Sequence, residues 1–104
     1  MTLSAMRYIL SGDKGFADKE TTRIFERVHS RKLPPDIQQT AYRKLRMLHN
    51  AQTLNDLRVP PANRLEKLSG ARAGQHSIRI NSQWRVCFVW DAGDAYAVEI
   101  VDYH

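Results

Sequence analysis

The spacing of apolar side chains divides the chain into a helical first part and a stranded second part. Up to the consecutive prolines Pro60 and Pro61, apolar residues return every three or four positions, which is typical of helices with one buried face. After these prolines, apolar and polar residues alternate, which is typical of strands that bury one face of a sheet. The change of period predicts helices first and a β-meander afterwards.

Two helices are expected before the prolines, at residues 18–30 and at residues 35–50, the second beginning with a proline that has no N–H to leave unpaired. Their apolar positions at helical spacing are Ile24, Phe25 and Val28 in the first and Ile37, Ala41, Leu45 and Leu48 in the second. Arg43, Lys44 and Arg46 are expected on the opposite, solvent-facing side of the second helix.

Four strands are expected after the prolines, at residues 65–68, 75–80, 83–90 and 95–103, and one short strand before the helices at residues 6–10. Residues 53–57 can add one helical turn, whereas residues 59–63 are expected to be irregular, because each proline lacks a donor. These elements predict an α+β fold, with two N-terminal helices packed on one face of a small antiparallel β-sheet. A length of 104 residues suits a single domain over residues 1–104.

The tight turns set which residues face each other across the strands. A three-residue loop at residues 81–83 places Arg79 opposite Arg85, and a further loop at residues 92–94 continues the meander. The apolar pairs that follow are Ile80 with Trp84, Ile78 with Val86, Trp90 with Tyr96, Phe88 with Val98, and Val86 with Ile100. A two-residue turn at Asn81 and Ser82 would separate the arginines, and the sequence leaves both turns open.

Two arginines directly opposite each other destabilise an antiparallel pair by a few tenths to about 1 kcal/mol. A bound phosphate would turn that repulsion into charge-assisted hydrogen bonds, for which the planar guanidinium is well suited. Arg79 and Arg85 are therefore candidates for binding phosphate. The alternative is that Glu99 or Asp102 on the neighbouring strand neutralises them.

Further basic residues precede this pair, and acid–base groups end the chain. Arg64, Lys67 and Arg72 lie in residues 63–74, and the last three residues supply a carboxylate, a phenol and an imidazole: Asp102, Tyr103 and His104. A net charge of +5 and a pI near 9.7 favour a polyanionic partner such as RNA. We expect a cationic surface with acid–base groups at its rim. The alternative is that the last three residues are only a solvated polar tail that ends a strand.

The composition narrows the other possibilities. Cys87 is the only cysteine, so no internal disulfide can form and a reducing compartment fits. We expect a cytoplasmic protein without a membrane span, because there is no long apolar run and no leader. No spacing of His and Cys predicts a metal site, and no glycine-rich loop predicts a nucleotide cofactor. His29, His49 and His76 are expected to be structural.

Residues 65–70 (LEKLSG), residues 74–88 (GQHSIRINSQWRVCF) and the terminal DYH resemble the HigB branch of the RelE/ParE toxin superfamily, as do residues 32–36 (KLPPD). The likeness covers nearly the whole chain. It implies a small ribonuclease-like α+β fold and an enzyme that cuts messenger RNA in the decoding site of the ribosome. It also implies a helix-turn-helix antitoxin of the HigA kind that blocks the toxin and represses the operon.

RNA cleavage without a metal needs a base, an acid and cations around the phosphate. His104 suits proton transfer near neutral pH, Asp102 can orient it or act as the base, and Tyr103 can stack on a base or donate to the phosphate. Arg79 and Arg85 would stabilise the transition state. The supporting RNA contacts are expected from Lys67, Arg64, Arg72 and Glu66.

Two positions depart from the pattern of some relatives, which carry His in place of Glu66 and Lys in place of Ser69. The departure predicts slower cleavage or redistributed roles, with Glu66 as a candidate base. Two other functions fit the same fold: a non-catalytic inhibitor of DNA gyrase like the ParE toxins, and a plain RNA-binding or partner-binding module. The terminal Tyr103 and His104 argue against the gyrase inhibitor, which needs no acid–base groups there.

Overall fold

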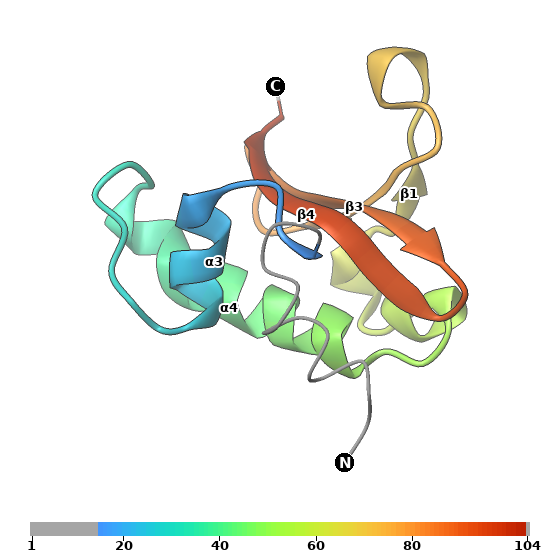
Figure 1. Ribbon diagram of the computed structural model, residues 1–104, viewed down its shortest axis with the longest axis horizontal. Helices are drawn as coiled ribbons and strands as arrows, with labels where there is room; N and C mark the ends of the chain where they lie inside the picture. Colours follow the sequence, from blue (N-terminus) through green and yellow to red (C-terminus); the bar gives the residue numbers. More distant parts are fainter. Residues whose placement is uncertain (1–14, 104) are drawn as a thin grey trace.

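The computed structural model describes residues 15–103; the strand expected at residues 6–10 and the residue His104 lie outside this range. Within it, two α-helices precede a four-stranded antiparallel sheet whose strands follow one another in the order β1-β2-β3-β4. Figure 1 shows α4 below the sheet, α3 to the left of the strands, and the end of β4 rising on the side away from α4. The predicted α+β fold, with helices before the sheet, is confirmed.

Helix α3 spans Lys19–Phe25 and is shorter than the expected helix at residues 18–30. It begins where the Asp18 carboxylate accepts a hydrogen bond from the backbone N–H of Thr21 at 2.7 Å, an N-cap that satisfies a free donor. It ends because Arg27 takes a left-handed conformation with φ of 62°. A left-handed residue after the last turn reverses the chain and closes a helix, so Val28 leaves the helix that the apolar spacing assigned to it.

Helix α4 spans Pro35–Asn50, as predicted, with proline in its first turn. Its buried stripe contains the expected Ile37, Ala41, Leu45 and Leu48. Arg43 and Arg46 are exposed as predicted, but the prediction for Lys44 is wrong, because this residue is buried. Lys44 follows Ala41 by three positions and therefore lies on the apolar stripe. Its Nζ donates to Asn63 Oδ1 at 2.6 Å, which satisfies the buried ammonium.

Two short 3₁₀ helices connect α4 to β1, η1 at Leu54–Arg58 and η2 at Pro61–Asn63, and a third, η3 at Gly70–Arg72, lies between β1 and β2. The first confirms the helical turn expected at residues 53–57. The second corrects the prediction of irregular structure at residues 59–63. Its two prolines occupy the N-cap and the first helical position, where a missing N–H breaks no hydrogen bond.

The strands are β1 (Glu66–Lys67), β2 (His76–Arg79), β3 (Trp84–Asp91) and β4 (Asp94–Asp102). In the β2–β3 pair Ile78 lies opposite Val86 and Arg79 lies opposite Arg85, as the three-residue loop predicted. Val86 in turn lies opposite Ile100. The register at this end of the sheet is therefore the predicted one.

At the other end of the β3–β4 hairpin the predicted register is wrong by one residue. Trp90 lies opposite Ala95 and not Tyr96, because the turn contains two residues, Ala92 and Gly93, instead of three. Both have positive φ, 53° and 85°, as a type I′ turn requires. The register shifts back between Cys87 and Val89. A β-bulge at Ala97, whose φ is 52°, accounts for the extra residue on β4.

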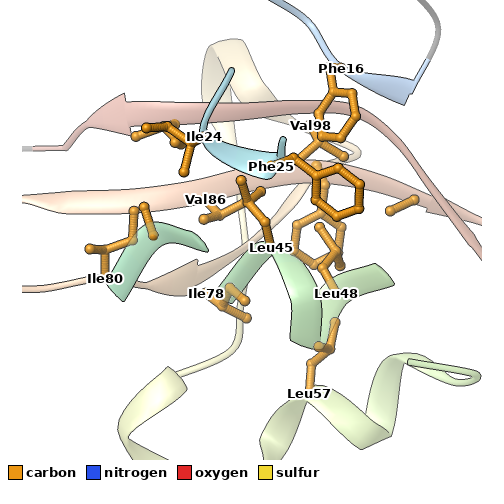
Figure 2. Close-up of a cluster of buried hydrophobic side chains, with 14 of the residues drawn as sticks. Phe16, Ile24, Phe25, Leu45, Leu48, Leu57, Ile78, Ile80, Val86 and Val98 are labelled. Carbon is orange, nitrogen blue, oxygen red and sulfur yellow. The ribbon is translucent and has the colours of Figure 1, made fainter. Parts of the chain in front are cut away.

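The core lies between the two helices and one face of the sheet. Figure 2 shows Ile24, Phe25, Leu45 and Leu48 from the helices meeting Ile78, Val86 and Val98 from the strands. Trp84 and Trp90 pack against this cluster while partly exposed, as expected. The register shift puts Ala95 in the core in place of Tyr96. Across residues 15–103, no helix combines the length and apolar character that crossing a membrane requires.

Candidate functional site

The sheet face opposite the helices carries an open hollow of about 400 Å³ near the end of β4. Its walls are formed by Arg64, Glu66, Arg79, Asn81, Ser82, Arg85 and Tyr103. The alternation of strands explains why these side chains meet. Arg79 and Arg85 are direct partners across β2 and β3, and Glu66 faces Ser77, two residues before Arg79 on the same side.

Arg85 is held in a single orientation by several contacts. Its Nε donates to Ser77 Oγ at 2.7 Å, and its Nη2 donates to the backbone carbonyl of Arg64 at 2.5 Å. The same Nη2 lies 3.4 Å from Glu66 Oε1 in an ion pair. Only 8% of Arg85 is exposed. Within residues 15–103 its Nη1 makes no hydrogen bond, so this N–H group is available to a ligand.

Arg79 differs from its partner. It is half-buried and forms neither a hydrogen bond nor an ion pair within the described part of the chain. Among the described residues, the alternative of neutralisation by Glu99 or Asp102 is not found for Arg79. Glu66 pairs with Arg85, whereas Glu99 pairs with Arg72 at 3.4 Å. Arg79 therefore adds an uncompensated cation to the hollow, directly across the strands from Arg85.

The carbonyl that anchors Arg85 is placed by a buried polar network behind the sheet. Asn63 is fully buried; its amide donates to the carbonyl of Leu57 at 3.1 Å, and its Oδ1 accepts from Lys44. The next residue, Arg64, has a φ of 44° and so turns the chain sharply toward the sheet. Burial, followed by the neighbouring positive charge of Arg43, lowers the pKa of the Lys44 ammonium. Helix α4 is thus connected to the site through Asn63, which accepts from Lys44 and directly precedes Arg64 in the chain.

The end of the chain contributes Tyr103 to the hollow and turns Asp102 away from it. The backbone N–H of Tyr103 donates to the carbonyl of Gln83 at 2.6 Å, and its ring centroid lies 5.9 Å from Arg85 Cζ. Asp102 is the register partner of Trp84, on the side of the sheet that the helices cover. Its Oδ2 accepts from Gln83 Nε2 at 3.1 Å.

The basic residues expected around the site are divided between different surfaces. Arg64 lines the hollow, but Lys67 and Arg72 do not. Lys67 is the register partner of His76, which stacks on the core residue Phe88 and thus belongs to the helix-covered side. Arg72 donates to Gln75 Oε1 at 3.0 Å and pairs with Glu99. Its salt bridge ties the loop between β1 and β2 to the sheet.

Three residues of the site were not predicted from the sequence: Ser77, Asn81 and Ser82. Ser77 could have been found from the period of two, because it shares a face with Arg79 and is a small hydroxyl in a strand. Asn81 could have been found as a turn residue whose side chain accepts from the backbone. Its Oδ1 accepts from the N–H groups of Gln83 and Trp84, both at 2.8 Å.

The titratable groups at the hollow are few. Among the described residues that line it, Glu66 and Tyr103 are the only ones with an acidic side-chain proton apart from the arginines. Burial lowers the pKa of His76, with a smaller effect from Lys67, but this imidazole is on the other side of the sheet. Burial raises the pKa of the fully buried Cys87 thiol, which favours the inert protonated form.

Comparison with known proteins shows similarity to HigB toxins. The family model described as a RelE-like toxin of the type II toxin-antitoxin system HigB matches residues 14–104. Toxin HigB-1 of Vibrio cholerae is 42% identical over 81 residues, which cover 77% of this chain and 85% of that protein. Endoribonuclease HigB of Proteus vulgaris is 29% identical over 91 residues, covering 88% and 98%. An uncharacterized protein of Haemophilus influenzae is 38% identical over 60 residues, covering 58% and 59%.

Proposed function

The chain belongs to the RelE-like HigB toxins of type II toxin–antitoxin systems, and on that premise we propose that it is an endoribonuclease that cuts messenger RNA during translation. One observation carries the proposal. Arg79 and Arg85 face each other across the β2–β3 pair beside an open hollow that also holds Glu66 and Tyr103. A phosphodiester would relieve the repulsion between the two guanidinium groups, and no group within the hollow relieves it for Arg79.

The chemistry we propose is attack by the ribose 2′-hydroxyl on the adjacent phosphate. The 2′-oxygen forms a bond to phosphorus while the bond from phosphorus to the 5′-oxygen breaks, leaving a 2′,3′-cyclic phosphate and a 5′-hydroxyl. A base removes the 2′-hydroxyl proton, and an acid protonates the leaving 5′-oxygen. Arg79 and Nη1 of Arg85 would stabilise the negative charge that develops on the phosphate. No metal is needed in this scheme.

The proton-transfer roles are assigned from the groups at the hollow. Glu66 is our candidate for the base, because its side chain is 54% exposed, borders the hollow and can reach a hydroxyl in it. Tyr103 can stack on a base or donate to the phosphate. His104, one residue further, is proposed as the acid. Because Asp102 faces the other way and accepts from Gln83, we assign it to holding the end of β4.

The setting of the reaction follows from the family. We propose that the substrate is messenger RNA in the aminoacyl site of the ribosome, that the protein acts in the cytoplasm, and that a helix-turn-helix antitoxin of the HigA kind neutralises it. A translation reaction with purified protein, with message ends mapped by primer extension, tests the first point. We expect cuts in translated messages only, with cyclic phosphate ends, and no cut where the codon carries a 2′-deoxyribose.

Arg79→Ala is the sharpest test of the site, because Arg79 makes no hydrogen bond or ion pair within the described residues and its removal should leave the fold intact. We expect cleavage to fall by about 10²–10³-fold, the loss typical of removing one transition-state donor, while the melting temperature stays unchanged. Arg85→Ala and deletion of Tyr103 and His104 should also abolish growth arrest. Arg43→Ala, on the exposed side of α4, is the control and should remain active.

Full toxicity of Arg79→Ala and Arg85→Ala would show that the hollow is not the active site. Loss of DNA supercoiling in treated cells with intact messages would instead support a gyrase inhibitor. In that case the same fold would act without RNA chemistry, and the proposed endoribonuclease would be wrong.

A further inference from the structure

A second basic surface lies on the loop between α3 and α4, far along the chain from the hollow. We call it the 27–32 surface; its exposed members are Arg27, Val28, His29, Arg31 and Lys32. Val28 is 44% exposed, and the hollows that it lines also contain Arg23, Arg31 and Glu26. Figure 1 shows this loop beside α3 and α4, away from the C-terminal end. It shares no residue with the hollow.

Hydrogen bonds to side chains hold the backbone of this loop. Ser30 is almost completely buried, and its N–H donates to Gln38 Oε1 at 3.1 Å. In return Gln38 Nε2 donates to the carbonyls of Ser30 at 2.8 Å and Leu33 at 2.9 Å. The Ser30 hydroxyl donates to Glu20 at 2.5 Å. These bonds hold the loop in one conformation, so a partner that binds it loses little conformational entropy of the loop.

Arg27 stands where glycine would be easier to accommodate. Its φ of 62° is in the left-handed region, and the N–H of Val28 donates to the carbonyl of Arg23 at 2.8 Å, the usual pattern of a glycine that closes a helix. Its Cζ lies 4.5 Å from the centroid of the Tyr42 ring. An arginine kept in a conformation that disfavours side chains suggests that the guanidinium has a use.

A hollow of about 330 Å³ lies between this loop and α4. Ile24, Val28 and Tyr42 form its apolar part, and Arg27, His29 and Gln39 form its polar part. It is large enough to receive one or two side chains of a partner. An apolar floor with a cationic rim fits a peptide segment that carries both apolar and acidic residues.

We propose that the 27–32 surface binds an acidic segment of the antitoxin, with an apolar side chain of that segment in the hollow beside Val28. The proposal rests on the membership in a toxin–antitoxin family from which the proposed function also starts. Charge complementarity carries it, because Arg27, Arg31 and Lys32 gather within six residues. A protein is favoured over RNA because an exposed valine contributes nothing to phosphate binding, and one face of the Tyr42 ring is already covered by a guanidinium.

The test uses the full-length toxin and the antitoxin from its operon, identified as the neighbouring gene product that restores growth. Val28→Ser combined with Arg31→Glu should raise the Kd for the antitoxin by about tenfold or more, and cells should stay arrested when both proteins are made. Ribosome-dependent cleavage should be unchanged. The matched control is Arg58→Glu combined with Val59→Ser, the same two changes at exposed positions of another segment, which should bind the antitoxin normally.

Arg27→Gly separates binding from folding. We expect this variant to melt at a higher temperature, because glycine suits the left-handed position, and yet to bind the antitoxin more weakly. An unchanged antitoxin Kd in both variants would overturn the proposal. So would an unchanged antitoxin Kd with weaker binding of a labelled single-stranded oligoribonucleotide, which would assign the surface to RNA. If the wild type proved unable to cut RNA while the variants still lost the antitoxin, the proposed function would fail and this surface would stand.

Discussion

The two faces of the sheet are ordered by different forces. On the helix-covered face, Ile78, Val86 and Phe88 are fully buried and held by apolar contact. On the site face, Ser77 and Arg85 are also buried, but hydrogen bonds and an ion pair fix them. Hydrophobic burial has no direction, whereas hydrogen bonds orient a group. Side chains on the helix-covered face stabilise the fold, and those on the site face orient the Arg85 guanidinium. Substitutions on the first face should therefore lower the free energy of unfolding, and those on the second should lower the rate of cleavage.

The largest effect on stability is expected from Phe88→Ala on the helix-covered face. Phe88 is fully buried, and replacing a buried phenylalanine with alanine costs about 3–5 kcal/mol, because a cavity remains. Urea unfolding followed by circular dichroism measures the loss. Val59→Ala, at a side chain that is 72% exposed, is the control and should cost almost nothing. A similar small cost for Phe88→Ala would mean that this face does not carry the fold.

A smaller effect, on activity, is expected from Ser77→Ala on the site face. The change removes the acceptor that Arg85 Nε reaches at 2.7 Å, a hydrogen bond to a charged group worth about 1.5–3 kcal/mol. Cleavage should fall by about tenfold or more, while the loss of stability stays below that of Phe88→Ala. Ser69→Ala is the matched control, because Ser69 makes no side-chain capping bond. Equal cleavage by both variants would show that the orientation of Arg85 does not limit the reaction.

The smallest effect is a dependence of stability on pH that arises from the helix-covered side. Burial lowers the pKa of His49 and His76, with smaller effects of Arg46 and Lys67, so the folded protein favours the neutral imidazoles. The unfolded chain takes up these protons near the ordinary pKa of about 6.5. The contribution of these two histidines to the free energy of unfolding is therefore fully present above that pH. It is lost as the pH drops below it toward their lower pKa values in the folded protein.

Melting temperatures at about pH 7.5 and about pH 5.5 test this dependence. The wild type should melt at a lower temperature at the acidic value, and the combination of His49→Gln and His76→Gln should reduce the difference. An unchanged difference in the double variant would assign the dependence to other groups. Arg79→Ala should leave the difference as it is, because it alters only the site face.

The sequence was sufficient for the fold where one periodic signal governed a segment. Helix α4 and the Arg79–Arg85 register were predicted because the apolar stripe and the strand alternation agreed with the turn between β2 and β3. The errors came from residues whose backbone conformation or burial the apolar pattern does not determine. Arg27 ended α3 early through a left-handed conformation that glycine usually adopts, and Lys44 was buried because Asn63, distant in sequence, satisfies its charge.

The candidate site was predictable in part for a similar reason. Alternation along β2 and β3 placed two arginines together, but it could not reveal that Glu66 neutralises one of them and leaves the other free. The anchoring carbonyl of Arg64 depends on backbone dihedral angles that no side-chain pattern encodes. Asp102 and Tyr103 are neighbours in sequence, yet alternation along the chain sends them to opposite sides, so Asp102 does not line the hollow with Tyr103.

The bulge at Ala97 and the two-residue turn at Ala92 and Gly93 displace the pairing of β3 with β4 in opposite senses. Their offsets cancel before the strands reach Arg85 and its partner Val101. The pairing at the end of the hairpin that borders the hollow is therefore independent of the pairing at its tip. A change in the length of the turn can be compensated by the bulge at residue 97. The orientation of the Arg85 guanidinium then stays the same while the turn at the far end of the hairpin changes.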